Sequence, residues 1–308
     1  MGVRKIWAKG GLMMKKKKSI NWNIFMIIGF IILVIYSISF ITPLIWVFNS
    51  AIRKEMSFLE NPFAIVNGNT FTFDYIKIAF DSLKVPVMID GTQYYIGFEE
   101  MMFNSVIYSG LCTLTHTLVP CITAYCVAKY NFKFSKILYT VVIVTIMLPT
   151  IGNLASSIQV SKWFGAYDSF LGLSVMKGYF IGTNFLIFYA CFKGISNEYM
   201  EAAEMDGASQ WQIMTKVVMP LAKPTIYAVA LITFITYWND YTTPMIYLPS
   251  HPTISYGLYY LCNSHDQAVN VLAVRLAACM IVSIPILIVF IIFRKKLMGN
   301  MTVGGLKG

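Results

Sequence analysis

A short aromatic and amide-rich run, Tyr237-Trp238-Asn239-Asp240, lies in the fifth long apolar segment of this 308-residue chain. Aromatic rings stack on the C–H faces of sugars, and amide and carboxylate groups hydrogen-bond to sugar hydroxyls. Asp240 is the only acidic residue of the segment, and an acid within a membrane usually faces a cavity or a partner. The run therefore predicts a solute path, and the alternative is a partly hydrated carboxylate beside an interfacial aromatic belt.

Three further polar residues lie in or beside apolar segments. Asn104 and Asn153 stand at the expected outer ends of the second and third segments. They either line the same path or join helices by hydrogen bonds. His116 lies in the second segment, where it either packs between helices or contributes to the path. Asp240 and His116 together would suit a proton path in a secondary transporter that works alone.

Motifs for catalysis are absent from the sequence. It contains no G-x-x-x-x-G-K-[ST] nucleotide loop, no H-E-x-x-H and no G-x-S-x-G. Its three histidines are far apart, and its six cysteines are scattered, mostly in apolar runs, without a C-x-x-C pair. This spacing disfavours metal sites and disulfides. We therefore expect no catalytic residue, no metal and no cofactor in this chain.

A polar stretch at residues 201–220 interrupts the C-terminal half, and its sequence predicts two short helices. Asn197 is placed to cap the first helix. Gly207 suits the left-handed position that ends it. Ser209 and Gln212 form a Ser-x-x-Gln capping box at the start of the second. Short helices across the mouth of a membrane bundle suit contact with a partner protein.

The same stretch resembles the cytoplasmic-loop signature of ABC importer permeases, which is Glu-Ala-Ala, three residues, Gly, nine residues and Ile-x-Leu-Pro. The chain has Glu201-Ala202-Ala203, Gly207 and Val217-Val218-Met219-Pro220 at this spacing, and Ser196 where the family often has Pro. Four further runs resemble the carbohydrate-importer class: Asp206-Gly207-Ala208-Ser209, Ala124-Tyr125 with Lys129, Tyr237-Trp238-Asn239-Asp240, and Gly304-Gly305-Leu306-Lys307-Gly308.

The resemblance implies partners for this chain. They are a second permease subunit, two ATPase subunits that bind and hydrolyse ATP with magnesium, and an extracytoplasmic sugar-binding protein. Small alanines in the loop would allow close backbone approach, and a glutamate would pair with a basic group of the ATPase. The residues implied in ATPase coupling are Glu201, Ala202, Ala203, Asp206, Gly207 and Ser209.

Composition indicates that the chain is an integral membrane protein. Hydrophobic residues make up 57% and charged residues 12%, and several apolar runs reach or approach the ~20 residues that span a bilayer. We expect spans at about 24–48, 103–128, 137–154, 173–192, 225–248 and 271–293. These divide the chain into a basic tail (1–23), the first span with a long outer loop (24–98), a five-span permease core (99–293) that holds the coupling loop (193–223), and a second tail (294–308).

Basic residues predict the orientation. The formal net charge is +10. If the N-terminus is cytoplasmic, 17 of the 24 basic residues fall on the inner side, as the positive-inside rule expects. Both termini are then cytoplasmic in a multi-pass protein surrounded by lipid, and the basic excess needs no nucleic acid.

The expected outer loop at 249–270 contains no Lys or Arg. It is rich in tyrosine and asparagine, and the resemblance implies that it meets the binding protein. The alternative is a plain connector between two spans. The candidate contact residues are Tyr256, Tyr259, Tyr260 and Asn263.

The sequence thus predicts an all-α integral membrane protein, a six-span helical bundle with a cytoplasmic coupling helix. The expected function is the permease subunit of an ATP-driven importer of a sugar or oligosaccharide in a bacterial cell membrane, which couples ATPase closure to alternating access. The alternatives are a permease for another solute, a proton-coupled secondary transporter and a structural anchor. A secondary transporter does not explain the spaced Glu-Ala-Ala loop, and an anchor needs no polar groups within the membrane.

Overall fold

A computed structural model describes residues 24–89, 91–130, 132–148, 152–266 and 269–298. The chain divides into two compact units, residues 1–46 and 47–308, and helix α1 (Ile24–Ala51) runs across their boundary. Apolar side chains stand exposed around most of α1, as expected for a helix surrounded by hydrocarbon. The basic tails at 1–23 and 299–308 lie outside the described residues.

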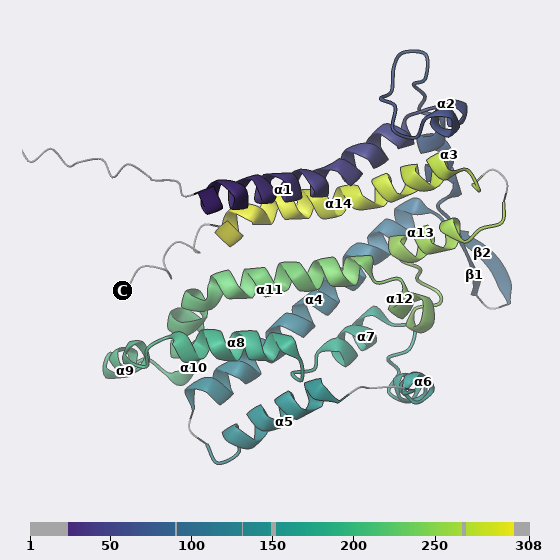
Figure 1. The fold of residues 1–308 in the computed structure, drawn as a ribbon. Coiled ribbons are helices and arrows are strands. Elements are labelled where there is room, and N and C mark those ends of the chain that lie inside the picture. The colour runs from purple at the N-terminus through teal and green to yellow at the C-terminus, as the bar shows by residue number, and fades with distance from the viewer. Residues whose placement is uncertain (1–23, 90, 131, 149–151, 267–268, 299–308) are drawn as a thin grey trace, which may run out of the picture. The chain divides into compact units, whose positions relative to one another are not determined.

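Four helices within the described ranges are long and apolar enough to cross a membrane. They confirm a mostly helical membrane protein, whereas the number of six spans stays a prediction. The four are α1, α4 (Phe98–Lys129), the run through α10 (Gln210–Gln212), the π-helix η1 (Ile213–Val218) and α11 (Met219–Asn239), and α14 (Leu272–Met298) (Figure 1).

The expected third span is shorter in the structure. Helix α5 (Ser135–Met147) has 13 residues, and a separate helix α6 (Leu154–Trp163) follows it. The backbone of Leu148 is extended, because a proline comes next in the sequence and its ring disfavours helical geometry at the residue before it. The helix therefore ends at Met147, before the expected end of this span at residue 154.

The expected fourth span is two helices, α7 (Phe170–Lys177) and α8 (Thr183–Gly194), with a non-helical break between them. Gly182 has φ 158°, a conformation that residues with a Cβ rarely adopt. A Cβ on Gly178 would lie 3.3 Å from the Cβ of Thr115 on α4. Glycines thus allow the helix to stop and the break to lie close against α4.

The fifth span ends at Asn239 and does not continue to residue 248 as expected. Asp240 is extended, and its Oδ1 accepts a hydrogen bond of 3.0 Å from the backbone N–H of Thr243. This contact satisfies a free donor in the first turn of α12 (Thr242–Tyr247). A short separate helix therefore follows α11.

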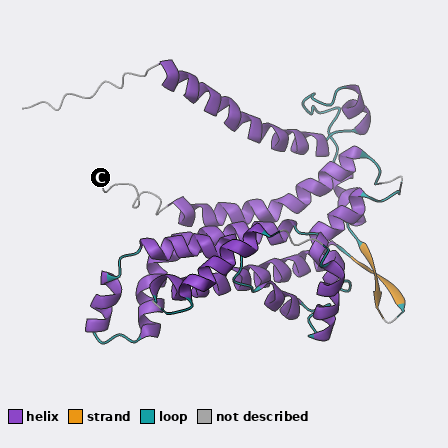
Figure 2. Cartoon of the chain, turned by 60° about the horizontal axis from the view of Figure 1, so that its bottom comes forward, coloured by secondary structure: helices purple, strands orange, loops and turns teal. Residues whose placement is uncertain are grey.

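Two regions expected to be loops hold regular structure. The first contains α2 (Glu55–Glu60), α3 (Asp74–Ser82) and a hairpin of β1 (Val85–Ile89) and β2 (Thr92–Ile96). The hairpin is antiparallel and pairs Val85 with Ile96 (Figure 2). The second contains α13 (Ile254–Cys262), whose N-cap Thr253 accepts from the N–H of Tyr256.

A buried arginine organises the segment between α1 and α3. The guanidinium of Arg53 donates to the carbonyl oxygens of Ser57, Asn61 and Ala64, and lies 5.4 Å from the ring centroid of Phe58. Backbone carbonyls take the place of a carboxylate partner here and stabilise the buried charge. Arg53 thereby joins three backbone positions of a segment that has little regular structure.

Helix α4 contributes to all three buried clusters. Met101 packs with the hairpin, α13 and α14; Tyr108 and Cys112 pack with α7 and α11; Tyr125 packs with α8 and η1. His116 and Lys129, on the same helix, contact the α7–α8 break and the segment before residue 198. Helix α4 therefore connects both ends of this unit.

Candidate solute cavity and coupling loop

The polar loop contains helix α9 (Glu198–Met205). The turn that follows this helix has the structure that the sequence predicts. Gly207 has φ +80°, which confirms the left-handed conformation. Its N–H donates to Glu204, and the N–H of Ala208 donates to Ala203, so the two bonds make a Schellman motif. The loop therefore turns at a residue where a side chain would strain the backbone.

The predicted capping box is also confirmed, whereas the predicted first cap is wrong. Ser209 accepts from the N–H of Gln212, and Gln212 accepts from the N–H of Ser209 at 2.9 Å. The side chain of Asn197 makes no capping bond. Its Oδ1 instead accepts from Lys129 at 2.9 Å, and Ser196 accepts from the N–H of Glu198. A long-range partner on α4 has replaced the local cap.

The loop exposes most of its predicted coupling residues. Glu201, Ala202, Asp206, Gly207 and Ser209 are exposed, and Ala203 is partly buried against the core. The carboxylate of Glu201 makes no hydrogen bond or ion pair with a described residue.

Two large apolar side chains of this loop were missed by the sequence analysis. Met205 is 89% exposed and Trp211 is 69% exposed. The sequence could have indicated both residues, because each is a large apolar residue inside a polar stretch. An exposed face that combines an unpaired acid with apolar side chains has the chemistry of a protein contact.

Hydrogen bonds fix the loop to the end of α4. Lys129 Nζ donates to the Ile195 carbonyl, Tyr130 donates to Gln210 at 2.6 Å, and Gln210 donates to Glu204 at 2.7 Å. Beyond the loop, the π-helix η1 leads into α11. The loop is therefore attached to two long helices, α4 and α11.

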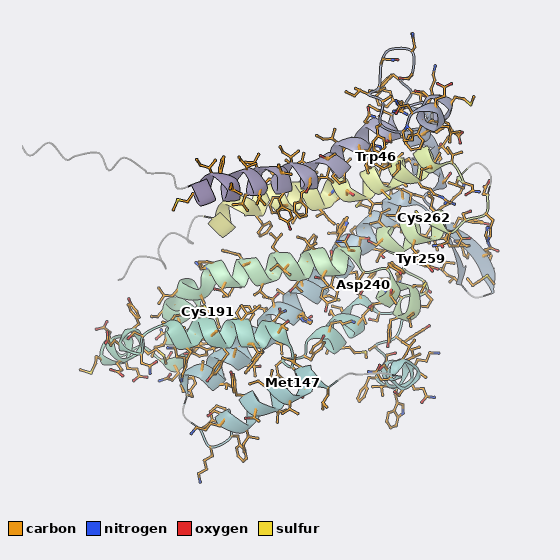
Figure 3. The ribbon with its side chains drawn as sticks, in the orientation of Figure 1. Trp46, Met147, Cys191, Asp240, Tyr259 and Cys262 are labelled. Atoms are coloured by element: carbon orange, nitrogen blue, oxygen red, sulfur yellow. The ribbon has the colours of Figure 1, made fainter. Side chains whose placement is uncertain are left out.

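A polar cavity of about 380 Å³ lies where α7 and α8 separate. Parts of α4, α7, α8 and α11 supply its walls, and Figure 3 shows Asp240 at the end of α11. Hydroxyl, amide, imidazole, ammonium and carboxylate groups converge on it, which suits a solute with many hydroxyls. Its lining residues are His116, Lys177, Tyr179, Thr183, Asn184, Ile232, Thr233, Thr236, Tyr237 and Asp240.

Hydrogen bonds join the cavity walls. Tyr108, which is 1% exposed, donates to Asp240 Oδ2 at 2.9 Å. His116 Nδ1 lies 2.9 Å from the Tyr237 hydroxyl oxygen and 3.1 Å from the Lys177 carbonyl oxygen. Asn184 donates to Thr233 at 3.4 Å. These contacts fix the cavity's polar groups in position before a solute binds.

The residues predicted for the solute path separate into two groups. Tyr237 and Asp240 line the cavity. Trp238 is buried on another side of α11 and donates to Val282 of α14, and Asn239 is exposed and donates to Ile235. Asn104 is buried and donates to the Pro252 carbonyl at 3.1 Å. Asn153 is exposed before α6 and is not among the cavity's lining residues.

Helix α13 presents part of the predicted tyrosine set. Tyr259 (Figure 3) stacks on Tyr241 with ring centroids 4.4 Å apart. Asn263 is exposed. Tyr260 lines a groove of about 460 Å³ that the hairpin also borders. Burial, with added repulsion from Tyr260 and Tyr259, raises the pKa of the Tyr256 phenol, so this hydroxyl stays a neutral hydrogen-bond donor.

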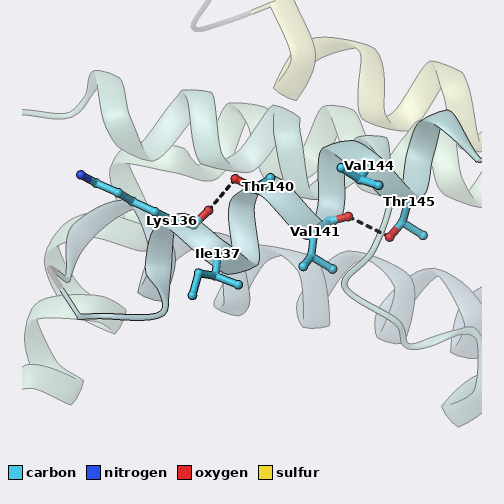
Figure 4. Close-up of a pocket in the computed structure, with 6 residues that line it drawn as sticks. All are labelled: Lys136, Ile137, Thr140, Val141, Val144 and Thr145. Carbon is cyan, nitrogen blue, oxygen red and sulfur yellow. Dashed lines mark hydrogen bonds between the residues drawn. The ribbon is translucent and has the colours of Figure 1, made fainter.

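A second hollow, of about 370 Å³, lies along α5 and lacks such groups. One helix supplies all of its lining, and the hydroxyls of Thr140 and Thr145 already donate to carbonyls of the same helix (Figure 4). Among the described residues, no three His, Cys, Asp or Glu side chains gather as a metal site would require. The cavity at the α7–α8 break is therefore the stronger candidate for a solute.

The model of one protein family, "Binding-protein-dependent transport system inner membrane component", matches residues 117–301. The match covers more than half of the chain and includes the loop at 193–223 and most residues that line the cavity. The chain belongs to this family. Because the family consists of inner membrane components of transport systems, this permease is a transporter subunit and not an enzyme.

Individual proteins resemble this permease over nearly their whole length. It is 25% identical to a trehalose/maltose transport system permease protein of Thermococcus litoralis, over 93% of this chain and 97% of the relative. It is 27% identical to a maltodextrin transport system permease protein of Bacillus subtilis, over 91% and 95%. A chain from the crystal structure of a bacterial ABC transporter for import of the acidic polysaccharide alginate shares the fold, with a TM-score of 0.67 and 22% identity over 90% of this chain and 98% of that one.

Proposed function

We propose that this permease takes up a sugar or an oligosaccharide in an ATP-driven importer. The observation that carries the proposal is a cavity of hydrogen-bonding side chains connected by a single helix, α4, to an exposed loop. The two relatives named above are permease proteins of transport systems for trehalose/maltose and for maltodextrin. Family membership disfavours a secondary transporter that works alone.

The proposed complex contains a second permease, two ATPase subunits and an extracytoplasmic sugar-binding protein. ATP and magnesium bind to the ATPases, and α9 with its exposed Glu201 sits against one of them. Thirteen residues separate His116 from Lys129 on α4, about 20 Å of helix. A shift at the loop would therefore reach the cavity through one continuous helix, and the cavity would open alternately to the two sides.

We also propose that the exposed face of α13 meets the binding protein. Because α13 is packed into the core through Ile254 and Leu261, a point substitution tests this better than replacement of the loop. Tyr260→Ala should raise the binding-protein concentration needed for half-maximal ATP hydrolysis. An unchanged concentration dependence would leave α13 as a connector.

Uptake into vesicles tests the proposed function. The complete complex, purified with its cognate partners and reconstituted, should accumulate members of a labelled panel of oligosaccharides (maltotriose, arabinotriose, trigalacturonate) only with ATP and binding protein. A panel of amino acids and peptides is the control. Uptake of these controls without any carbohydrate uptake would overturn the proposal.

A topology with cytoplasmic termini makes a separate prediction. In a cysteine-free background, Lys216→Cys should resist a membrane-impermeant maleimide added to intact cells, because it lies in η1 at the expected cytoplasmic end of the helix that continues into α11, whereas Asp81→Cys should react. Both positions are exposed in the structure, so permeabilised cells should label both and supply the control. Labelling of Lys216→Cys in intact cells would contradict this orientation.

A further inference from the structure

Lys177 brings a positive charge to the cavity and has no counter-ion in the described part of the chain. It is the last residue of α7, is partly buried and lines the cavity. Its carbonyl contacts His116, whereas its ammonium group makes no hydrogen bond or ion pair with a described residue. A charged group inside a membrane protein is usually paired with an opposite charge, so we expect an anionic partner for the Lys177 ammonium group.

The carboxylate of Asp240 does not supply that partner. It lines the same cavity, but its two oxygens already accept from the Tyr108 hydroxyl at 2.9 Å and the Thr243 N–H at 3.0 Å. No ion pair within 4.0 Å joins it to Lys177 among the described residues. The protein therefore stabilises the negative charge with its own donors, whereas the Lys177 ammonium group has no partner among the described residues.

The local backbone adds to the positive potential. Helix α8 begins at Thr183, which lines the cavity, and its N-cap Gly182 offers no side chain to satisfy the free N–H groups of the first turn. The N-terminus of a helix carries a partial positive charge. Unwound segments between half-helices also recur at solute sites in transporters. Besides Lys177, the ionisable side chains that line the cavity are His116, Tyr179, Tyr237 and Asp240.

We propose that the cavity selects carbohydrates that carry an anionic group, a carboxylate or a phosphate, with the Lys177 ammonium as its counter-ion. The proposal rests on the proposed function, because it names the solute class of the same cavity. Sugar hydroxyls would bond to Asn184, Thr233 and the Tyr237–His116 pair while the anion pairs with Lys177. A uronate sugar and a sugar phosphate share this chemistry.

Direct binding and uptake measurements test the selection. The complete complex in nanodiscs is titrated with trigalacturonate, glucose 6-phosphate and maltotriose, and uptake of the same three solutes is measured in vesicles. A charge-assisted hydrogen bond contributes about 1.5–3 kcal/mol, which corresponds to roughly 10- to 150-fold in affinity. One of the two anionic solutes should be taken up, and Lys177→Gln should lower the affinity for that solute by at least about tenfold.

The variant series separates charge from structure. Lys177→Arg should retain anion binding, Lys177→Glu should abolish it, and Lys162→Gln, an exposed lysine outside the cavity, should change nothing. Trigalacturonate and glucose 6-phosphate distinguish a uronate from a phosphate ligand. Equal loss of neutral and anionic binding in Lys177→Gln, or wild-type uptake of maltotriose alone, would overturn the proposal. Absence of uptake of any carbohydrate would instead contradict the proposed function.

Discussion

Replacing Gly207 with valine should abolish ATP-driven uptake while the chain still inserts into the membrane. Gly207 has φ +80° and nothing within 4 Å of an added Cβ, so the cost is conformational and amounts to roughly 1–2 kcal/mol. That cost falls on the Schellman motif, which sets the angle between α9 and α10. The measurement is co-purification of the ATPase together with ATP hydrolysis stimulated by the binding protein.

Matched charge reversals on α9 separate coupling from local folding. Glu201→Lys should place like charges together at a desolvated contact with the ATPase, and such contacts cost several kcal/mol. Glu198→Lys, at the start of the same exposed helix, should do much less. If Gly207→Val and Glu201→Lys both retain parental assembly and hydrolysis, the loop does not couple the subunits.

Removal of the Asp240 carboxylate should have the largest effect within the membrane. Asp240→Ala leaves the hydroxyl of Tyr108, which is 1% exposed, without its 2.9 Å acceptor, and an unsatisfied buried donor costs about 1–3 kcal/mol. A shift of about 2 kcal/mol changes a conformational equilibrium roughly 30-fold. Uptake should therefore fall by at least about tenfold, and the complex should inactivate at lower temperature.

The partner residue supplies the control for Asp240. Tyr108→Phe removes the buried donor and keeps the ring, so adding it to Asp240→Ala should recover part of the lost thermal stability, as coupled residues require. Asn239→Ala changes an exposed neighbour that bonds only its own helix and should keep uptake near the parental level. Full additivity of Tyr108→Phe and Asp240→Ala would contradict a functional network.

Local signals in the sequence predicted local structure well. The capping box at Ser209 and Gln212 and the left-handed Gly207 depend on residues only a few positions apart, and both are present. Asn197 was misassigned because Lys129, distant in the sequence, competes for its side chain. Local chemistry is therefore predictable wherever no distant group takes part.

The cavity was only partly predictable for the same reason. Tyr237 and Asp240 stood out as polar residues in an apolar segment. Lys177 and Asn184 did not, because the break that brings them to the cavity depends on glycines that an apolar helix also tolerates, and on the fit of Gly178 against α4. The hairpin and α13 lie in regions expected to be loops, and each is stabilised by apolar residues that pack on the core, such as Val85 and Ile254.

The break between α7 and α8 also constrains how the chain is made. The two helices have 8 and 12 residues, about 12 Å and 18 Å long, so neither reaches across the ~30 Å of hydrocarbon alone. Backbone N–H and carbonyl groups at residues 179–182 lie outside both helices, and any of them left without a partner would be costly in contact with lipid. During biosynthesis this segment should therefore stay at the insertion machinery until it packs against α4, which shields its backbone from lipid. Its final insertion should depend on α11, which is synthesised later.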